Sequence, residues 1–154
     1  MKKLCLIFFS LLMVSCASSK LVGDSYKTLK GEWTLNSVTY SDNGIYKTTL
    51  LNDATKQCFE GSNWQFVPNN NTGTYTINNS DCTTGVRYFN FSLQEMSNGT
   101  VDFMLKPTDK KHNPDTNQGF RLTLTQLSTS TMQLQQAISV NGSPLKINMN
   151  FTKK

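Results

Sequence analysis

The sequence has little of what enzymes use for catalysis. It contains one histidine, His112, no Gly-x-Ser-x-Gly segment and no pair of carboxylates on one predicted strand. Acid–base and nucleophilic catalysis need a nucleophile within reach of a base, and neither group can be assigned here. Residues 115–119 match only part of a calcium-binding loop, because the closing glutamate is absent. The sequence therefore predicts no enzyme activity, no metal site and no cofactor.

Charged residues are also scarce, at 16% of the chain, and the formal net charge is a mild +5. The basic residues are scattered among Thr, Asn and Ser rather than gathered in a stripe with aromatic residues between them. Proteins that bind nucleic acid need such a stripe to neutralise phosphates. We therefore expect no nucleic-acid partner.

The chain lacks an apolar run long enough to span a membrane. Its apolar stretch at residues 4–13 has about ten residues, whereas a spanning helix needs about 20. Lys2 and Lys3 precede this stretch, and Val14 and Ser15 follow it. A positive start, a short apolar run and small or medium-sized residues are typical of a signal peptide that is removed from the mature protein.

The end of this signal, Met13-Val14-Ser15-Cys16, resembles the lipobox of bacterial lipoproteins. The resemblance implies a lipoprotein signal peptide at residues 1–15, with palmitate or a related acyl chain on Cys16. It also implies a tether at residues 16–28 and a folded domain at residues 29–154. Such a protein would be lipid-anchored in the bacterial cell envelope, and we expect it at the outer membrane. The alternative is an ordinary secretory signal that leaves an unmodified protein.

The few cysteines fit an exported protein. Cys5 lies within the signal and Cys16 is assigned to the lipid, so Cys58 and Cys82 remain as an even pair. Disulfides persist in oxidising compartments outside the cytosol. We therefore predict a structural disulfide between Cys58 and Cys82. A redox pair or two metal ligands are the alternatives, although the spacing matches neither Cys-x-x-Cys nor a zinc motif.

The segment between these two cysteines is predicted to form a hairpin. Two short stretches of alternating apolar and polar residues flank a turn-rich stretch around Asn70. A turn centred there would place Phe66 opposite Tyr75 and Trp64 opposite Ile77. The same register would bring the two cysteines almost opposite one another, at the open end of the hairpin.

The N-terminal part of the mature chain is predicted to begin with a short helix at residues 21–29, followed by a strand at residues 31–40. The turn-forming residues 41–44 predict a hairpin, so residues 45–51 should form a second strand that folds back on the first. Asn52 and Asp53 can cap a short helix that runs to Cys58.

Alternation of apolar and polar residues continues from Cys82 to the C-terminus, so each predicted strand has one apolar face. Short turn signals such as Asn98-Gly99 and Asn141-Gly142 predict that consecutive strands are neighbours. Pairing the two free edges of such a meander removes exposed backbone. We therefore predict an all-β protein, an antiparallel up-and-down β-barrel of eight to nine strands, with a two-sheet sandwich as the alternative. The apolar faces include Phe89, Phe91, Leu93, Val101, Phe103, Leu105, Phe120, Leu122, Leu124, Met132, Leu134, Leu145, Ile147, Met149 and Phe151.

Gly31 and Trp33 form a Gly-x-Trp motif at the start of the first strand, and a long connection and many alternating strands follow. Together with residues 56–66, this pattern resembles the lipocalin-like domain of small bacterial lipoproteins over about residues 29–152. The resemblance implies a calycin-like barrel, a lid over its mouth at residues 52–60 and a small hydrophobic ligand. It also implies a basic residue stacked on Trp33, for which Arg121 or Arg87 are the candidates.

An eight-stranded barrel is just wide enough to hold one small ligand or to be filled by its own side chains. Gln136 is either a polar contact in a pocket or a strand-end residue that reaches water. The primary hypothesis is a tethered protein that binds a small hydrophobic ligand, and the alternative is a structural or protein-interaction module with a filled barrel. Inhibition of a hydrolase is a third hypothesis, with no residues of its own to support it. The candidate ligand-lining residues are Trp64, Phe66, Tyr75, Phe89, Phe91, Phe103, Met132 and Met149.

Overall fold

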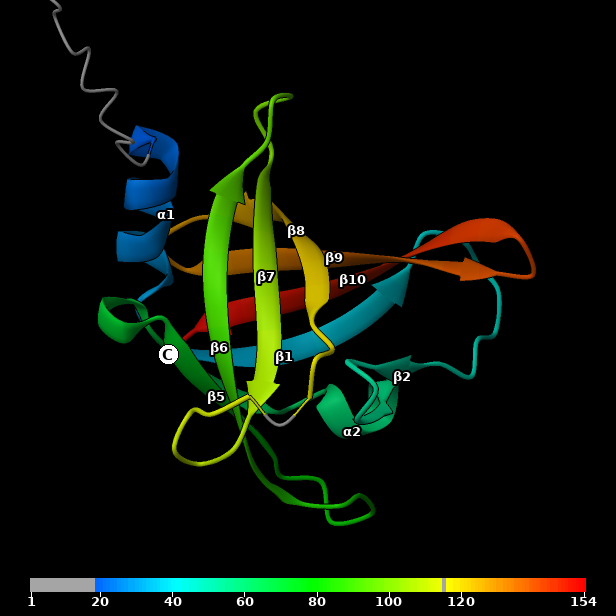
Figure 1. Cartoon of the computed structure of the whole chain (residues 1–154). Coiled ribbons are helices and arrows are strands. Elements are labelled where there is room, and N and C mark those ends of the chain that lie inside the picture. The colour runs from blue at the N-terminus through cyan, green and yellow to red at the C-terminus, as the bar shows by residue number, and fades with distance from the viewer. Residues whose placement is uncertain (1–18, 115) are drawn as a thin grey trace, which may run out of the picture.

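The computed structural model describes residues 19–114 and 116–154. Eight antiparallel strands close into a barrel in the order β1-β10-β9-β8-β7-β6-β5-β4, and β1 pairs with β4 to complete the ring (Figure 1). This arrangement confirms the predicted up-and-down barrel. The strands are β1 (Gly31–Tyr40), β4 (Asn63–Val67), β5 (Thr72–Ile77), β6 (Gly85–Glu95), β7 (Val101–Thr108), β8 (Phe120–Leu127), β9 (Thr131–Val140) and β10 (Ser143–Lys153).

The barrel is a meander because consecutive strands from β4 to β10 are neighbours, and short turns join several of them. Asn141 and Gly142 link β9 to β10 with φ values of +51° and +81°, the left-handed backbone that a two-residue hairpin turn requires. Gly99, with φ of +79°, lies in the turn between β6 and β7. Asn and Gly tolerate this backbone better than other residues, so these turn signals were read correctly.

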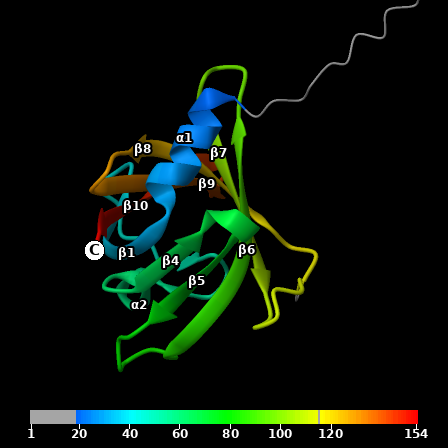
Figure 2. The same cartoon turned by 90° about the vertical axis from the view of Figure 1, so that its left-hand side faces the viewer.

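Helix α1 (Lys20–Leu29) lies across one end of the barrel (Figure 2). The Ser19 side chain caps it by accepting a hydrogen bond from the backbone N–H of Val22. Tyr26 contacts Phe91 of β6, with ring centroids 5.9 Å apart, and the Trp33 indole N–H donates to the carbonyl of Leu29. The predicted helix is therefore present, and residues 20–28 of the predicted tether belong to it.

Residues 1–18, with the predicted signal peptide and Cys16, lie outside the described residues. None of the described helices is long and apolar enough to cross a membrane.

The basic residue stacked on Trp33 is Lys153, so the choice of Arg121 or Arg87 was wrong. The Lys153 amine lies 5.2 Å from the centroid of the Trp33 ring and donates to the carbonyl of Thr28 at 2.7 Å. Arg121 pairs instead with Asp102, and Arg87 with a carboxylate at the other end of the barrel, as described below. Lys153 reaches Trp33 because the two residues are partners in the β1–β10 register.

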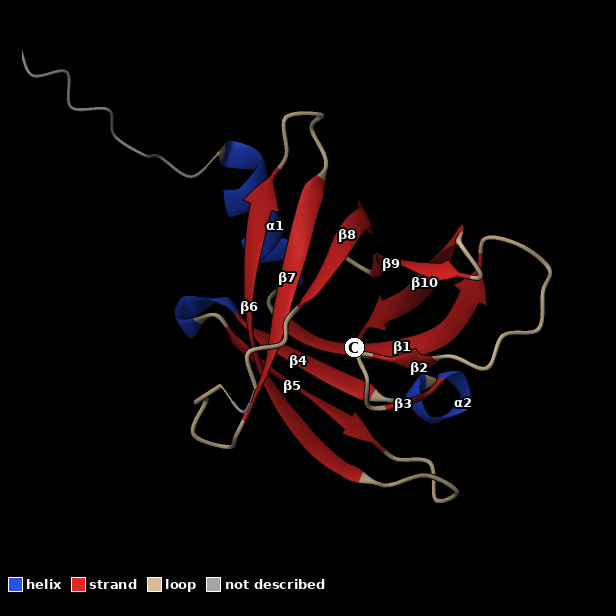
Figure 3. Cartoon of the chain, turned by 45° about the vertical axis from the view of Figure 1, so that its right-hand side comes forward, coloured by secondary structure: helices blue, strands red, loops and turns tan. Residues whose placement is uncertain are grey.

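The predicted strand at residues 45–51 was also wrong. β10 occupies one edge of β1. On the other edge β4 pairs only with Gly31–Thr34, and beyond it Leu35 and Val38 bond to the segment before β4, with Val38 N–H donating to the Glu60 carboxylate, instead of to a hairpin partner. Residues 41–48 instead form an irregular connection. It leads to a small separate sheet of β2 (Thr49–Leu50) and β3 (Ala54–Thr55), then to α2 (Lys56–Phe59), which lies close to where the short helix was predicted (Figure 3).

The hairpin between the two cysteines is present, but its predicted register was wrong by two residues. Trp64 pairs with Tyr75, and Phe66 with Gly73. The connection is a 3-10 turn, η1 (Pro68–Asn70), followed by Asn71 at φ +58°. The connection ends sooner than predicted, so β5 already begins at Thr72.

Candidate functional site

The lumen of the barrel is filled by aromatic rings. The ring of Phe66 lies within 6.1 Å, between centroids, of the rings of Trp64, Phe89, Phe91 and Phe103. Such centroid separations are those of rings in direct contact. The eight candidate ligand-lining side chains are all at least 95% buried: Trp64, Phe66, Tyr75, Phe89, Phe91, Phe103, Met132 and Met149.

Of these eight residues, Tyr75 and Phe89 also border a hollow of about 240 Å³ between β5, β6 and β7. The other six are core residues, and their role in ligand binding stays a prediction. The hollows described next lie instead at the end of the barrel opposite α1. We call this end the mouth.

Two segments cover the mouth. We call residues 41–48 the strap and residues 49–60 the lid. The lid inserts three buried apolar side chains, those of Leu50, Leu51 and Phe59, into the end of the core. Leu51 and Asn52 turn the chain at φ of +51° and +53°, a left-handed backbone that is unfavourable for a leucine. Burial of the leucine side chain offsets that strain, so apolar burial holds the lid in place.

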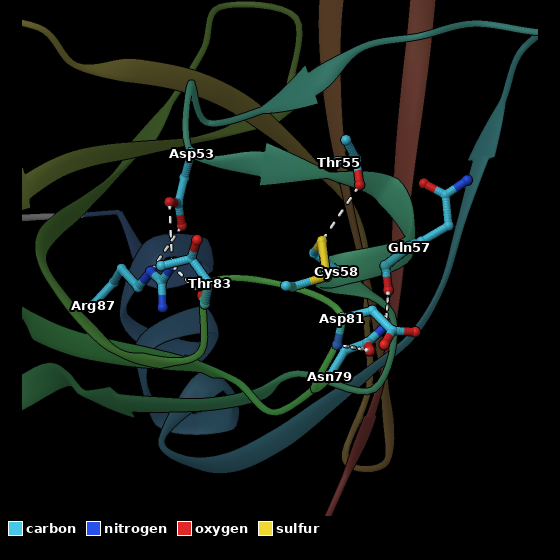
Figure 4. The surroundings of a disulfide bond; sticks show 9 residues. Asp53, Thr55, Gln57, Cys58, Asn79, Asp81, Thr83 and Arg87 are labelled. Atoms are coloured by element: carbon cyan, nitrogen blue, oxygen red, sulfur yellow. Dashed lines mark hydrogen bonds and ion pairs between the residues drawn. A yellow bond between two sulfur atoms is a disulfide. The ribbon is translucent and has the colours of Figure 1, made fainter.

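Polar contacts and a disulfide also hold the lid (Figure 4). The Asp53 carboxylate accepts a hydrogen bond from the Tyr75 hydroxyl at 2.9 Å. It accepts another from Arg87 Nε at 3.0 Å, which Figure 4 shows. Arg87 also donates to the carbonyls of Gly85 and Thr83, which fixes its guanidinium beside the lid. Burial, together with the negative charge of Asp53, raises the pKa of Tyr75, so the phenol stays a protonated donor.

The predicted disulfide is confirmed. Cys58 in α2 and Cys82 in the β5–β6 connection are bonded, with their Cα atoms 5.8 Å apart. Asn79 of the same connection donates to the carbonyl of Gln57 in α2. The bond therefore joins the lid to the connection after β5, beyond the open end of the β4–β5 hairpin, which is the end where it was predicted.

A hollow of about 560 Å³ lies between the strap and the lid. Tyr40, at the end of β1, and Tyr46 in the strap contact each other there, with ring centroids 5.1 Å apart. The Lys56 amine lies 5.7 Å from the centroid of Tyr40. Ile45 also lines the hollow and is 99% exposed, which is unusual for a large aliphatic side chain. The hollow thus combines apolar and aromatic walls with two lysines, Lys47 and Lys56, in its lining.

Local contacts shape the strap. The Asp42 carboxylate accepts hydrogen bonds from the Tyr46 hydroxyl and from the backbone N–H of Gly44. These bonds lower the pKa of Asp42, and the same contact raises the pKa of Tyr46. The Tyr46 ring folds over Gly44 so closely that a Cβ there would lie 2.5 Å from the ring. A glycine at position 44 is therefore what allows Tyr46 to form a wall of the hollow.

A second hollow, of about 700 Å³, lies on the other side of the strap, against the end of β9. Gln136 lines it, and its Oε1 atom is buried without a hydrogen-bond partner among the described residues. Gln136 therefore does border a pocket, one that lies at the mouth. Within the described parts of the chain, no three His, Cys, Asp or Glu side chains are grouped to hold a metal ion.

Sequence reasoning missed most residues of the mouth. Tyr40, Ile45 and Tyr46 were assigned to ordinary strands, the last two because residues 41–44 were interpreted as a hairpin turn. The signal that could have found the strap was the Asp42-x-Gly44 spacing, since Asp side chains commonly accept a hydrogen bond from the backbone two residues later.

Comparison with known proteins agrees with this architecture. A family model described as a lipocalin-like domain matches residues 29–134. A lipocalin-like protein from Bacteroides uniformis is 15% identical with a TM-score of 0.51, and the match covers 82% of this chain and 99% of that one. An uncharacterized protein from Bacteroides eggerthii is 12% identical with a TM-score of 0.49, over 82% of this chain and 99% of that one. No curated protein matches the sequence.

At such low identity the Bacteroides uniformis structure supports the fold alone. The family model, in contrast, spans well over half of the chain and includes Gly31 and Trp33, the residues on which the resemblance was first based. The chain belongs to the lipocalin-like domain family.

Proposed function

We propose that this protein binds a small hydrophobic ligand at the mouth of its barrel, between the strap and the lid. The hollow there, of about 560 Å³, carries the proposal, because ligand pockets commonly have about 300–1,000 Å³. The fold is compatible with ligand binding, while the lumen is occupied by the protein's own rings. A ligand at the mouth needs no rearrangement of that core.

The lining of the hollow suits an apolar molecule with a small polar part. Tyr40 and Tyr46 provide flat aromatic walls, and Ile45 would exchange its contact with water for a contact with the ligand. Burying apolar surface yields about 25 cal/mol per Å², so covering one aliphatic side chain favours binding by about 1.5–3 kcal/mol.

Binding can be tested with N-phenylnaphthylamine, an apolar probe whose fluorescence rises out of water. We expect Tyr46→Ala to weaken probe binding about tenfold, since one aromatic contact contributes about 0.5–1.5 kcal/mol beyond its buried area. Gly44→Ala should act in the same direction by displacing the Tyr46 ring.

Gly23→Ala is the matched control, because a Cβ there meets nothing within 4 Å and lies on α1 at the far end. It should leave probe binding unchanged. Equal affinities of all three variants and the unaltered protein would place the probe elsewhere and refute the site.

We further propose that the chain is a lipoprotein of the bacterial cell envelope, anchored through acyl chains on Cys16. The lipobox-like residues 13–16 support this, and so does the position of α1, which begins at Lys20 on the end of the barrel opposite the mouth (Figure 1). An anchor there would leave the mouth facing away from the membrane. Cys16→Ala, made in the full chain, should move the protein from the membrane fraction to the soluble fraction. Unchanged membrane association would contradict the anchor.

The alternative is a protein-interaction module that binds no small molecule. The filled lumen favours it, since a barrel packed with rings provides a stable platform for a surface. Absence of probe binding at the mouth would support this alternative over the ligand hypothesis.

A further inference from the structure

One stretch of the barrel wall is left unpaired. β9 pairs with β10 along its whole length, from Thr131 to Val140, but its pairing with β8 stops at Gln135. Residues 136–140 therefore form a free edge that projects past β8, on the mouth side of the barrel (Figure 3). No backbone hydrogen bond joins this edge to another described segment.

The register identifies which backbone groups are free. In an antiparallel strand, the N–H and C=O groups of alternate residues point toward opposite neighbours. The two-residue turn at Asn141 and Gly142 makes Val140 and Ser143 a pair that exchanges both backbone hydrogen bonds, so even-numbered residues of β9 direct their N–H and C=O groups toward β10. By the same two-residue period, Ala137 and Ser139 direct their N–H and C=O groups to the empty side. Both residues are exposed, as expected for an uncovered edge.

This edge has none of the usual protection against strand addition. Proteins commonly protect free edges with charged residues, proline or a bulge. The sequence Gln-Ala-Ile-Ser-Val at 136–140 has no charge and no proline, and it pairs with β10 without a bulge. Ile and Val are also strong strand formers. A strand of this kind is a ready template for another extended segment.

A groove runs beside the edge. The hollow of about 700 Å³ lies between the strap and β9, and Ile45, Ile138 and Val140 provide its apolar surface. Gln136 Oε1 is the unpaired acceptor already noted in this groove. Even-numbered residues of β9 face inward, so alternate side chains of an added strand would enter the groove beside them.

Two lysines and one carboxylate lie around the edge, the carboxylate being that of Asp42, which accepts a hydrogen bond from the groove residue Tyr46. Lys47 is the one charged residue of the groove lining, and Lys146 lies opposite Ala137 on the outer face. A second copy of the chain would bring the same lysines to the pair, whereas a strand with acidic residues on its outer face would complement them.

We propose that the free edge of β9 binds an extended peptide segment of another protein by β-strand addition. The segment pairs with Ala137 and Ser139, places alternate apolar residues in the groove and presents acidic residues on the outer face. This goes beyond the ligand site, which lies on the other side of the strap.

The test uses a synthetic peptide of alternating glutamate and valine with blocked ends, and its lysine–valine counterpart. The acidic peptide should bind the purified protein about threefold more tightly than the basic one, because the outer face offers one lysine, Lys146, and one charge pair contributes about 0.2–1 kcal/mol. Its binding should slow hydrogen exchange of the Ala137 and Ser139 amides, measured by NMR, and leave the Ile138 amide, which already faces β10, unaffected.

Variants separate edge pairing from adventitious contact. Ala137→Pro and Ser139→Pro remove one free N–H each and should weaken the acidic peptide about tenfold, whereas Ala137→Ser and Ser139→Ala keep the N–H and should bind within about twofold. Circular dichroism verifies the fold of each variant. The same test can be made on the peptide. N-methylation of the peptide amides that face β9 should weaken binding, whereas N-methylation of the peptide amides that face away from β9 should not.

Three results would overturn the proposal: no binding of the acidic peptide, equal binding of both peptides, or binding that survives the proline variants and methylation. A dimer in analytical ultracentrifugation that Ala137→Pro dissociates would show that a second copy covers the edge instead. N-phenylnaphthylamine binding should be the same in Ala137→Pro as in the unaltered protein, so failure of this proposal and failure of the ligand site are distinguishable.

Discussion

At the scale of single residues, Gly73 shows how closely the barrel is packed. It lies in β5, and a Cβ there would overlap the Phe89 ring and lie 2.7 Å from the carbonyl oxygen of Gln65. Neither neighbour can move freely, since one is core and the other is backbone of β4. Gly73→Ala should therefore lower the free energy of unfolding by about 1–3 kcal/mol, the usual cost of overpacking. Urea denaturation measures this difference.

The same substitution at Gly23 should have the opposite sign. Gly23 lies in α1 with nothing within 4 Å of an added Cβ. Alanine in a helix is more favourable than glycine by about 0.5–1 kcal/mol, so Gly23→Ala should stabilise the protein. If Gly23→Ala and Gly73→Ala destabilise the protein equally, the close contacts at Gly73 are not the cause of its destabilisation.

Trp33 marks the limit of sequence reasoning at this scale. That a basic side chain would stack on Trp33 was predictable from the family resemblance, and the structure contains one. The identity of this basic residue depends on which residue of β10 lies opposite Trp33 of β1. The two partners are about 120 positions apart in the sequence. Alternation reveals which face a residue occupies but not which distant strand lies beside it, so Lys153 could not be chosen over Arg121.

At the scale of elements, the disulfide should contribute a large part of the stability. It links Cys58 and Cys82, 24 residues apart, and so restricts the unfolded chain. Replacing both cysteines with serine should lower the free energy of unfolding by about 3.5 kcal/mol on the chain-entropy account. Urea denaturation with and without reductant provides the check, because reductant should affect the unaltered protein and not the double variant. A loss well under about 1 kcal/mol would show that apolar burial and the Asp53 hydrogen bonds hold the lid without the disulfide.

The strap should respond to acid. Hydrogen bonds from Tyr46 and Gly44 lower the pKa of Asp42, so its ionised form is favoured in the folded protein. A lowered folded pKa stabilises the strap fully above the unfolded value of about 3.9, and that contribution is lost as the pH falls through the folded value. NMR signals of the Tyr46 ring should thus be constant near neutrality and shift below about pH 3.9. Asp42→Asn should abolish that shift. A shift centred near neutrality would contradict this assignment.

Elements were predictable wherever one face is buried. The β4–β5 register was wrong by two residues, yet an even shift leaves every side chain on its predicted face, so Trp64 and Phe66 still point inward. The strap was not predictable in this way, because the turn signal at residues 41–44 predicts a hairpin, whereas the edge of β1 beyond Thr34 bonds to the Glu60 side chain rather than to a strand. Such contacts belong to the complete structure, and local pattern does not contain them.

At the scale of the whole molecule, the filled lumen separates this barrel from one that holds a ligand at its centre. Phe66 touches four other rings there. Phe66→Ala should cost about 3–5 kcal/mol, and the protein should still fold if its total stability lies in the usual range of about 5–15 kcal/mol. The variant would contain an apolar cavity of the kind that stays dry and binds benzene.

Benzene then reports whether the lumen of the unaltered protein has room. Benzene should raise the melting temperature of Phe66→Ala, because a ligand that binds only the folded state stabilises that state. It should leave the melting temperature of the unaltered protein unchanged. Gly73→Ala is the control for destabilisation by itself, since overpacking creates no cavity and benzene should have no effect on it. An equal rise in the unaltered protein would mean that the rings leave space between them, and the ligand site would then move from the mouth to the lumen, where Trp64, Phe91 and Phe103 would be its walls.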